Sequence, residues 1–232
     1  MSVHSPINVH IICEGQTEEA FVNDLLVEPF AHKGIYLRPA LIGRPGHKGG
    51  NFKFERLYPD VQKRLCGDRT CYCTTFFDFY GLPESFPGKT TLNAQSSIED
   101  KAQRLQTELM ARLTEKLGAD TMRRFIPYVQ MYEFEALLFS DPTKMAQGMD
   151  KPELASSFAD IAQGFATPEA INNSPQTAPS KRIECLVPGY EKPLMGVLAA
   201  IEIGLDKIRE QCHLFNGWLN QIEALATEEA RS

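Results

Sequence analysis

Apolar and polar positions follow two alternating patterns through the first part of the chain. Short apolar runs rich in β-branched and aromatic side chains predict buried strands at residues 9–13, 36–42, 71–77 and 125–131. Between these runs, apolar side chains recur at helical spacing over residues 17–26, 54–65 and 98–117. Strands that alternate with helices predict an α/β fold, in which a parallel sheet is covered by helices on both faces.

The pattern changes near residue 142. Short helical stretches are separated by a loop, "TPEAINNSPQTAPSKRI", and a final helix pair is expected at residues 196–213 and 214–226. We therefore predict an α/β core over residues 1–141 and a mainly helical C-terminal extension over residues 142–232. The extension is expected to pack on the core or to form one continuous domain with it.

Composition places the chain among ordinary globular proteins. It has 232 residues, 43% hydrophobic and 23% charged, with a net charge of −6 that argues against a basic surface but leaves room for a basic groove. It contains neither an apolar run near the roughly 18 residues of a membrane span nor a signal peptide, so a cytoplasmic location is expected. In that compartment disulfides are not expected, and the spacing of the six cysteines does not match a structural zinc site. The cysteines are therefore expected to be reduced thiols.

Acidic residues follow three of the predicted strands. These residues are Glu14, Asp78, and the pair Glu133 and Glu135. The carboxyl ends of parallel strands meet at one edge of a sheet, where ligands bind. Carboxylates gathered there repel one another unless a cation offsets their charge, and Mg²⁺ prefers a few such oxygens together with water and substrate phosphate. The pattern therefore predicts a site for Mg²⁺ or Mn²⁺ that acts on a phosphodiester.

Other charged residues near the predicted site have both a simple and a functional interpretation. Glu18 and Glu19 are explained as first-turn acids that interact with a helix dipole. Lys48 lies in the glycine-rich loop "RPGHKGG", which predicts either a phosphate contact or a solvent loop. Lys181 and Arg182, in "SPQTAPSKRI", suit phosphate oxygens, or they are incidental charges at a helix start. A Walker A motif is absent, so ATP hydrolysis by this chain alone is not expected.

The motifs at the strand ends resemble known families. "CEGQTEEAFV" after the first strand and "FFDFYGLP" after the third resemble a variant of the TOPRIM domain of topoisomerases, primases and nucleases of the overcoming-lysogenization-defect (OLD) type. Over nearly the whole chain, the ordered set "EGQTEEAFV", "GHKGG", "DFYGLP", "YEFEALLFSD" and "SPQTAPSKRI" is similar to the bacterial DUF4276 family. The resemblance implies a Rossmann-like, TOPRIM-like parallel sheet and a Mg²⁺-dependent phosphoryl-transfer site.

The resemblance also implies roles for individual residues. TOPRIM domains use a glutamate after the first strand as general acid or base, and Glu14 matches it. They bind metal through Asp-x-Asp after a later strand. Asp78 matches the first aspartate, but Tyr80 stands at the second position. Glu133 or Glu135 could supply the missing carboxylate, and we favour Glu133 slightly.

The expected function is a Mg²⁺- or Mn²⁺-dependent nuclease that hydrolyses phosphodiester bonds in nucleic acid, with DNA as the expected substrate. Lys48, Lys181 and Arg182 are expected to bind phosphate. The resemblance further implies phage defence or mobile elements as the setting, beside an ATPase partner of the AAA or ABC type. Two alternatives remain: a non-catalytic TOPRIM-like partner of an ATPase, which Tyr80 favours, and a small-molecule phosphohydrolase.

Overall fold

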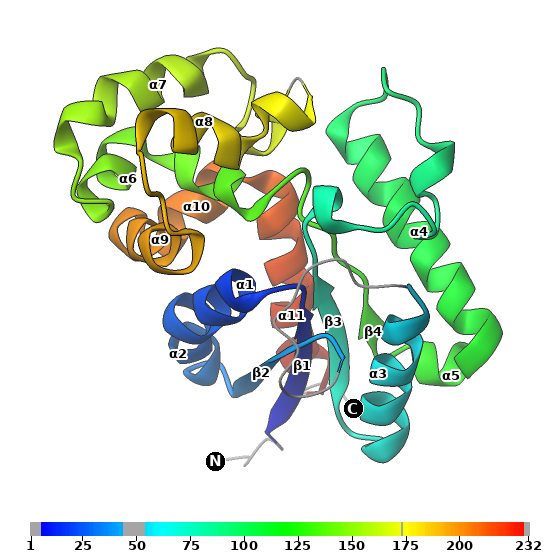
Figure 1. The fold of residues 1–232 in the computed structure, drawn as a ribbon. Coiled ribbons are helices and arrows are strands. Elements are labelled where there is room, and N and C mark those ends of the chain that lie inside the picture. The colour runs from blue at the N-terminus through cyan, green and yellow to red at the C-terminus, as the bar shows by residue number, and fades with distance from the viewer. Residues whose placement is uncertain (1–5, 44–53, 173, 230–232) are drawn as a thin grey trace.

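The computed structural model describes residues 6–43, 54–172 and 174–229. Within these ranges, parallel strands form one sheet in the order β2-β1-β3-β4 (Figure 1). The strands are β1 (Ile7–Cys13), β2 (Ile35–Leu41), β3 (Tyr72–Phe76) and β4 (Phe125–Ile126). The predicted parallel sheet flanked by helices, with a helical C-terminal part, is confirmed.

The fourth strand is shorter than predicted. β4 pairs with β3 over two residues, and beyond it only an isolated bridge joins Gln130 to Asp78. Pro127 directly follows β4 and has no N–H to donate, so it cannot continue the ladder. The chain nevertheless stays beside β3 long enough to place the residues after Gln130 at the carboxyl edge of the sheet.

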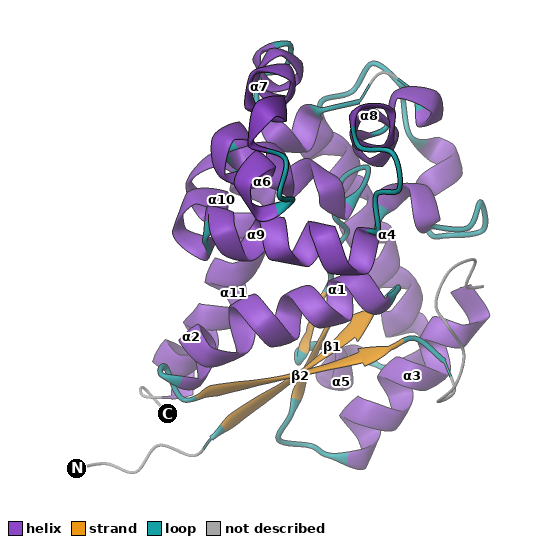
Figure 2. Ribbon diagram, turned by 60° about the vertical axis from the view of Figure 1, so that its left-hand side comes forward, coloured by secondary structure: helices purple, strands orange, loops and turns teal. Residues whose placement is uncertain are grey.

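Two hydrophobic clusters cover the two faces of the sheet. Val9, Ile11 and Cys13 of the central strand β1 are fully buried in one cluster, whereas Ile12 is buried in the other. The first face is covered by α1 (Gln16–Phe21), α2 (Val27–Ala31) and α11 (His213–Glu229), and the second by α3 (Phe54–Gly67), α4 (Ile98–Leu117) and α5 (Ala119–Met122) (Figures 1 and 2). Burial on both faces explains why residues 11–13 of β1 and 73–76 of β3 are all buried, whereas the edge strand β2 begins with alternating buried and exposed positions.

The C-terminal helices share the core of the sheet. They are α6 (Pro142–Gly148), α7 (Ala155–Gln163), α8 (Pro179–Leu186), α9 (Val197–Ile203) and α10 (Leu205–Gln211). Gly148 allows α6 and α9 to touch, because a Cβ at that position would lie 2.6 Å from the Cα of Ala199. Trp218 of α11 stacks on Tyr128 with ring centroids 4.5 Å apart, and its indole N–H donates to Thr74 of β3 at 2.8 Å. Residues on both sides of position 142 therefore belong to one hydrophobic core.

Short 3₁₀ and π-helical segments connect these elements. The 3₁₀ segments are Phe79–Gly81, Lys89–Thr91, Phe134–Ser140, Pro152–Leu154, Pro168–Ala170 and Pro175–Thr177, and the π-helical segments are Val22–Leu26 and Lys192–Gly196. The helix expected over residues 196–213 is divided between α9 and α10 at Gly204, whose φ of 84° lies in the left-handed region. In the part of the chain that is described, no helix is both long and apolar enough to cross a membrane.

Candidate functional site

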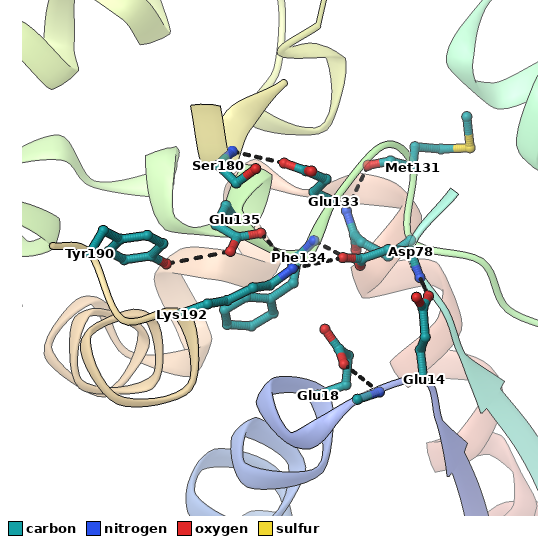
Figure 3. A network of polar contacts seen from close by, with 12 residues as sticks. Glu14, Glu18, Asp78, Met131, Glu133, Phe134, Glu135, Ser180, Tyr190 and Lys192 are labelled. Atoms are coloured by element: carbon teal, nitrogen blue, oxygen red, sulfur yellow. Dashed lines mark hydrogen bonds and ion pairs between the residues drawn. The ribbon is translucent and has the colours of Figure 1, made fainter. Parts of the chain in front are cut away.

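The site lies at the carboxyl edge of the sheet, where β1 and β3 end side by side. Cys13 is paired with Phe76, so Glu14 and Asp78 follow the two strands at nearly the same level. The backbone N–H of Asp78 donates to Oε2 of Glu14 at 3.1 Å (Figure 3). The two acids that the sequence placed at neighbouring strand ends are therefore in direct contact through the backbone.

Gly81 provides the space for the Glu14 carboxylate. A Cβ at position 81 would lie 1.9 Å from Oε1 of Glu14, far inside van der Waals contact. The glycine of "DFYGLP" is thus needed for close approach, although its own backbone is not in the left-handed region. A side chain on Gly81 would force the carboxylate of Glu14 out of its position.

Asp78 is held by a backbone donor and a lysine. Its Oδ1 accepts the N–H of Phe134 at 2.8 Å, and its Oδ2 lies 3.1 Å from Nζ of Lys192 (Figure 3). Phe134 lies two positions after Tyr132. Tyr132 adopts a φ of 63°, an uncommon conformation for a residue other than glycine. This turn brings the start of the Phe134–Ser140 segment to the carboxyl edge of the sheet.

Lys192 connects Asp78 to a third acid, Glu135. Nζ of Lys192 lies 3.0 Å from Oε2 of Glu135, a side chain with no solvent exposure. Oε1 of Glu135 accepts the hydroxyl of Tyr190 at 3.5 Å. Oε2 faces the lysine as an ion pair but has no hydrogen bond of normal geometry among the described residues. Lys192 thus occupies the space between two buried carboxylates.

Burial shifts the acid–base properties of this cluster. Desolvation, together with the nearby charge of Glu18, raises the pKa of Glu14 to about 7. Desolvation also raises the pKa of Asp78 well above its ordinary value and the pKa of Glu135 to about 7, with Lys192 opposing both shifts. For Lys192, burial lowers the pKa, but the charges of Asp78 and Glu135 outweigh it and raise the pKa well above its ordinary value. The lysine therefore stays charged at neutral pH, while Glu14 and Glu135 can gain or lose a proton there.

Glu18 has a larger part in the site than a first-turn acid alone. It is in the first turn of α1, where its Oε2 accepts the N–H of Gly15 at 2.9 Å. Its side chain is only 4% exposed and lies across from Glu14 and Lys192 (Figure 3). Its charge adds to the negative potential that raises the pKa of Glu14.

The two acids after β4 have different partners. Oε2 of Glu133 accepts the backbone N–H of Ser180 at 2.8 Å, in the first turn of α8. Glu133 therefore satisfies a helix N-terminus. Glu135, rather than the slightly favoured Glu133, is the acid that shares Lys192 with Asp78.

The two predicted basic residues that the structure describes, Lys181 and Arg182, do not contact the acids of the site. Lys181 is exposed and pairs with Glu184 at 2.7 Å. Nε of Arg182 donates to the carbonyl of Thr177 at 2.8 Å, and its guanidinium lies 5.2 Å from the ring centroid of Phe165. Lys48 lies outside the described residues.

Two lysines near Glu14 were not predicted from the sequence. Lys192 comes from "YEKPLMG", which resembles no site motif and lies 114 positions from Asp78. Lys89 follows the turn after β3, donates to the carbonyl of Leu82 and lies 5.6 Å from the ring centroid of Phe79. Its charge slightly lowers the pKa of Glu14. Lys192 reaches the site only through long-range packing, whereas the contacts of Lys89 are local, and neither lysine belongs to a recognised site motif.

The donor chemistry of the site fits a hard divalent cation. Lys192 contacts Asp78 and Glu135, and Glu14 and Glu18 lie nearby, so these four carboxyl groups outnumber the lysine (Figure 3). Among the described residues, no three side chains converge into a ready-made metal cage. Mg²⁺ usually takes one or two carboxylates together with water and substrate phosphate, so a complete protein cage is not needed. Of the predicted metal ligands, Asp78 is the carboxylate beside Glu14 that would help to hold such an ion.

The comparison with known proteins identifies the family. A family model described as a domain of unknown function, DUF4276, matches residues 13–223. No curated protein and no solved structure shows a significant match to the chain. The matched span runs from the last residue of β1 into α11, so it includes all the acids of the site and Lys192. Because this match covers most of its length, the chain belongs to the DUF4276 family.

Proposed function

We propose that this chain is a divalent-metal-dependent nuclease that hydrolyses phosphodiester bonds, with Glu14 as its general acid or base. The observation that carries the proposal is the contact between Glu14 and the backbone N–H of Asp78, beside the Asp78–Lys192–Glu135 chain of ion pairs. This arrangement stands at the carboxyl ends of parallel strands, the usual ligand-binding edge of such sheets. Its lysine suits a negatively charged phosphate, and its carboxylates suit the divalent cation that would offset the remaining negative charge.

The acid–base step rests on Glu14. During hydrolysis water adds to phosphorus, the bond from phosphorus to the leaving oxygen breaks, and that oxygen gains a proton. A carboxyl group with a pKa of about 7 is present in both protonation states near neutral pH, so it can take a proton from the water or supply one to the leaving oxygen. Fixing its orientation through Asp78 and Gly81 places this group before substrate arrives.

The role proposed for Lys192 is to stabilise the negative charge of the substrate phosphate. Phosphoryl transfer depends largely on positioning and electrostatic stabilisation. The ammonium group of Lys192 is held at 3.0 Å and 3.1 Å by two carboxylates, so its location is fixed, and its 35% exposure leaves it accessible to a phosphate oxygen. When bound, Mg²⁺ or Mn²⁺ would offset further negative charge at this edge of the sheet.

The proposed biological setting is inferred from the resemblance to OLD-type TOPRIM nucleases. We propose DNA as the nucleic acid, a cytoplasmic location, and a role in phage defence beside an ATPase of the AAA or ABC type. A non-catalytic partner of such an ATPase is the second candidate. Two observations favour it: Lys192 already compensates part of the charge of Asp78 and Glu135, and the Tyr80 hydroxyl donates to Asn172 at 2.5 Å where TOPRIM domains have a metal-binding aspartate.

The test is a set of cleavage assays with Mg²⁺ or Mn²⁺ on plasmid, single-stranded DNA, RNA and free nucleotides. Glu14→Gln and Asp78→Asn should abolish metal-dependent cleavage, whereas Glu19→Gln, in the same first turn as Glu18, should retain it. Cleavage that persists unchanged in both site variants would contradict the proposed site. Hydrolysis of nucleotides alone would indicate a small-molecule phosphohydrolase, and the absence of metal binding in calorimetry would favour the non-catalytic candidate.

A further inference from the structure

Three aromatic rings lie immediately beside Asp78. The ring centroids of Phe79 and Tyr80 are 5.7 Å apart, and Tyr132 lies 5.9 Å from Phe79 and 5.8 Å from Tyr80. Tyr132 is buried at 8% exposure, whereas Phe79 and Tyr80 are only half-buried. The arrangement thus consists of two partly exposed rings, inclined by 55° to each other, that pack against a buried third.

The backbone of this aromatic cluster is fixed. The N–H of Phe79 donates to the carbonyl of Gln130 at 2.9 Å, and the N–H of Tyr80 donates to the carbonyl of Tyr132 at 3.1 Å. The hydroxyl of Tyr80 donates to Asn172, in the loop before α8. Tyr132 has a positive φ, a strained conformation that clusters at functional sites. Ring positions that are fixed in advance reduce the cost of ordering a platform for a ligand.

Positive charges stand next to the rings. Nζ of Lys89 lies 5.6 Å from the centroid of Phe79, and Lys192 contacts Asp78, the residue before Phe79. The planes of the Phe79 and Tyr80 rings are inclined by 55°, and Lys89 lies over the Phe79 ring, so Tyr80 offers the planar face for a ligand. A planar aromatic face close to a lysine matches a nucleotide, which has a planar base next to an anionic phosphate. A base stacks on aromatic side chains with little sequence preference, because every base has a π-face. In a duplex, neighbouring base pairs cover that face.

We propose that Tyr80, supported by Phe79 and Tyr132, forms a stacking platform for an unpaired base next to the scissile phosphate, and that the substrate is therefore single-stranded nucleic acid. This inference rests on the proposed nuclease function and names its substrate class. Tyr80, at the position of the second TOPRIM aspartate, then binds substrate instead of metal. Either DNA or RNA can supply the unpaired base, and the two are separated experimentally.

The experiment measures binding in the Glu14→Gln background, so that cleavage does not interfere. Labelled single-stranded DNA, the matching duplex and single-stranded RNA are titrated by fluorescence anisotropy, and 2-aminopurine placed along the DNA strand reports stacking by quenching. Single strands should bind about tenfold more tightly than duplex, and Tyr80→Ala should lose about tenfold in affinity together with the quenching at one position. Tyr80→Phe should keep both, as should Tyr36→Ala, which removes an exposed tyrosine of β2.

Equal affinity for duplex and single strand, or unchanged quenching in Tyr80→Ala, would overturn the platform. Thermal unfolding of each variant shows whether it is folded, and Tyr80→Trp, which retains a large ring, should restore binding if Tyr80→Ala is unstable. The two proposals fail separately. Quenching without any cleavage by the unmodified chain contradicts the nuclease and retains the platform. Equal cleavage of duplex and single strands, unaffected by Tyr80→Ala, contradicts the platform and retains the nuclease.

Discussion

Nζ of Lys192 lies 3.1 Å from Oδ2 of Asp78, although 114 positions separate the two residues in the chain. Asp78 follows a central strand, whereas Lys192 begins a short segment between α8 and α9. The contact therefore joins the helical C-terminal part to the carboxyl edge of the sheet (Figure 3). It also compensates part of the charge of two buried acids, so the lysine contributes to both folding and the site.

Replacing Lys192 with methionine should destabilise the fold. The change keeps most of the side-chain volume but leaves Asp78 and Glu135 without their cation. Breaking a fully buried ion pair costs roughly 3–5 kcal/mol. Because the Lys192 side chain is 35% exposed, water offsets part of that cost, and we expect a loss of about 2 kcal/mol in the free energy of unfolding. Urea unfolding at pH 7 measures it.

A matched variant separates lost charge from lost packing. Glu135→Gln added to Lys192→Met removes one of the unpaired carboxylates, so the double variant should regain part of the lost stability. Lys181→Met, at an exposed lysine of α8, should change the free energy of unfolding by less than about 0.5 kcal/mol. A Lys192→Met protein as stable as the unmodified chain would show that the ion pairs contribute nothing to the fold.

The sequence predicted the acids of the site but not Lys192. The acids follow from the local pattern at the strand ends, whereas Lys192 depends on contacts between segments far apart in the chain. Glu14 and Asp78 directly follow apolar runs, and the parallel sheet brings the ends of such runs together. Their proximity thus follows from local pattern and topology. Lys192 reaches them only through the packing of the helices after residue 142, for which periodicity gives no register.

The sequence pattern also could not decide whether Glu133 or Glu135 lies beside Asp78, although both acids are close to the predicted strand. Continued beyond the predicted strand over residues 125–131, simple alternation would put these two acids on the same side, because they are two positions apart. The ladder instead ends at Ile126, next to Pro127, and Tyr132 turns the chain with a φ of 63°. These irregularities direct Glu133 to α8 and Glu135 to Lys192, and no periodic pattern contains that information.

Gly81→Ala should disturb the site while the fold persists. The added Cβ would lie 1.9 Å from Oε1 of Glu14 and would displace this carboxylate. A displacement of about 1 Å can cost on the order of a hundredfold in rate, so metal-dependent cleavage should fall by about that factor. Gly67→Ala is the matched control, since nothing lies within 4 Å of its added Cβ. Equal cleavage rates in Gly81→Ala and the unmodified chain would contradict a role for the position of Glu14.

Glu169→Ala should weaken the attachment of α11 to the core. The fully buried carboxylate of Glu169 accepts the N–H groups of Leu214 and Phe215, both at 2.9 Å, at the start of that helix. Losing a helix cap typically costs about 1–2 kcal/mol, and the free energy of unfolding should fall by at least that amount. Glu153→Ala, at an exposed glutamate, is the control. A Glu169→Ala protein that unfolds at the same urea concentration would contradict the capping role.

The stability of the fold should fall as pH rises from about 4.5 to about 7, in part because of Glu14. Its pKa is raised from 4.5 to about 7 in the folded chain, chiefly by desolvation, so between these values the folded state binds more protons than the unfolded state. The stability that comes from protonated Glu14 is fully present below pH 4.5 and is lost as pH passes 7. Glu135, whose pKa is also about 7, contributes in the same direction.

Urea unfolding between pH 5 and pH 8 tests this titration. Glu14→Gln replaces the acid with a neutral amide, so its free energy of unfolding should fall less steeply with pH than that of the unmodified chain. The double variant with Glu135→Gln should have a still smaller slope, because it removes two of the groups that gain protons on folding. Glu19→Gln, which changes a neighbouring acid of α1, should keep the original slope. If Glu14→Gln also keeps that slope, Glu14 titrates near its ordinary pKa and is too well hydrated to exchange protons at neutral pH as the proposed acid or base.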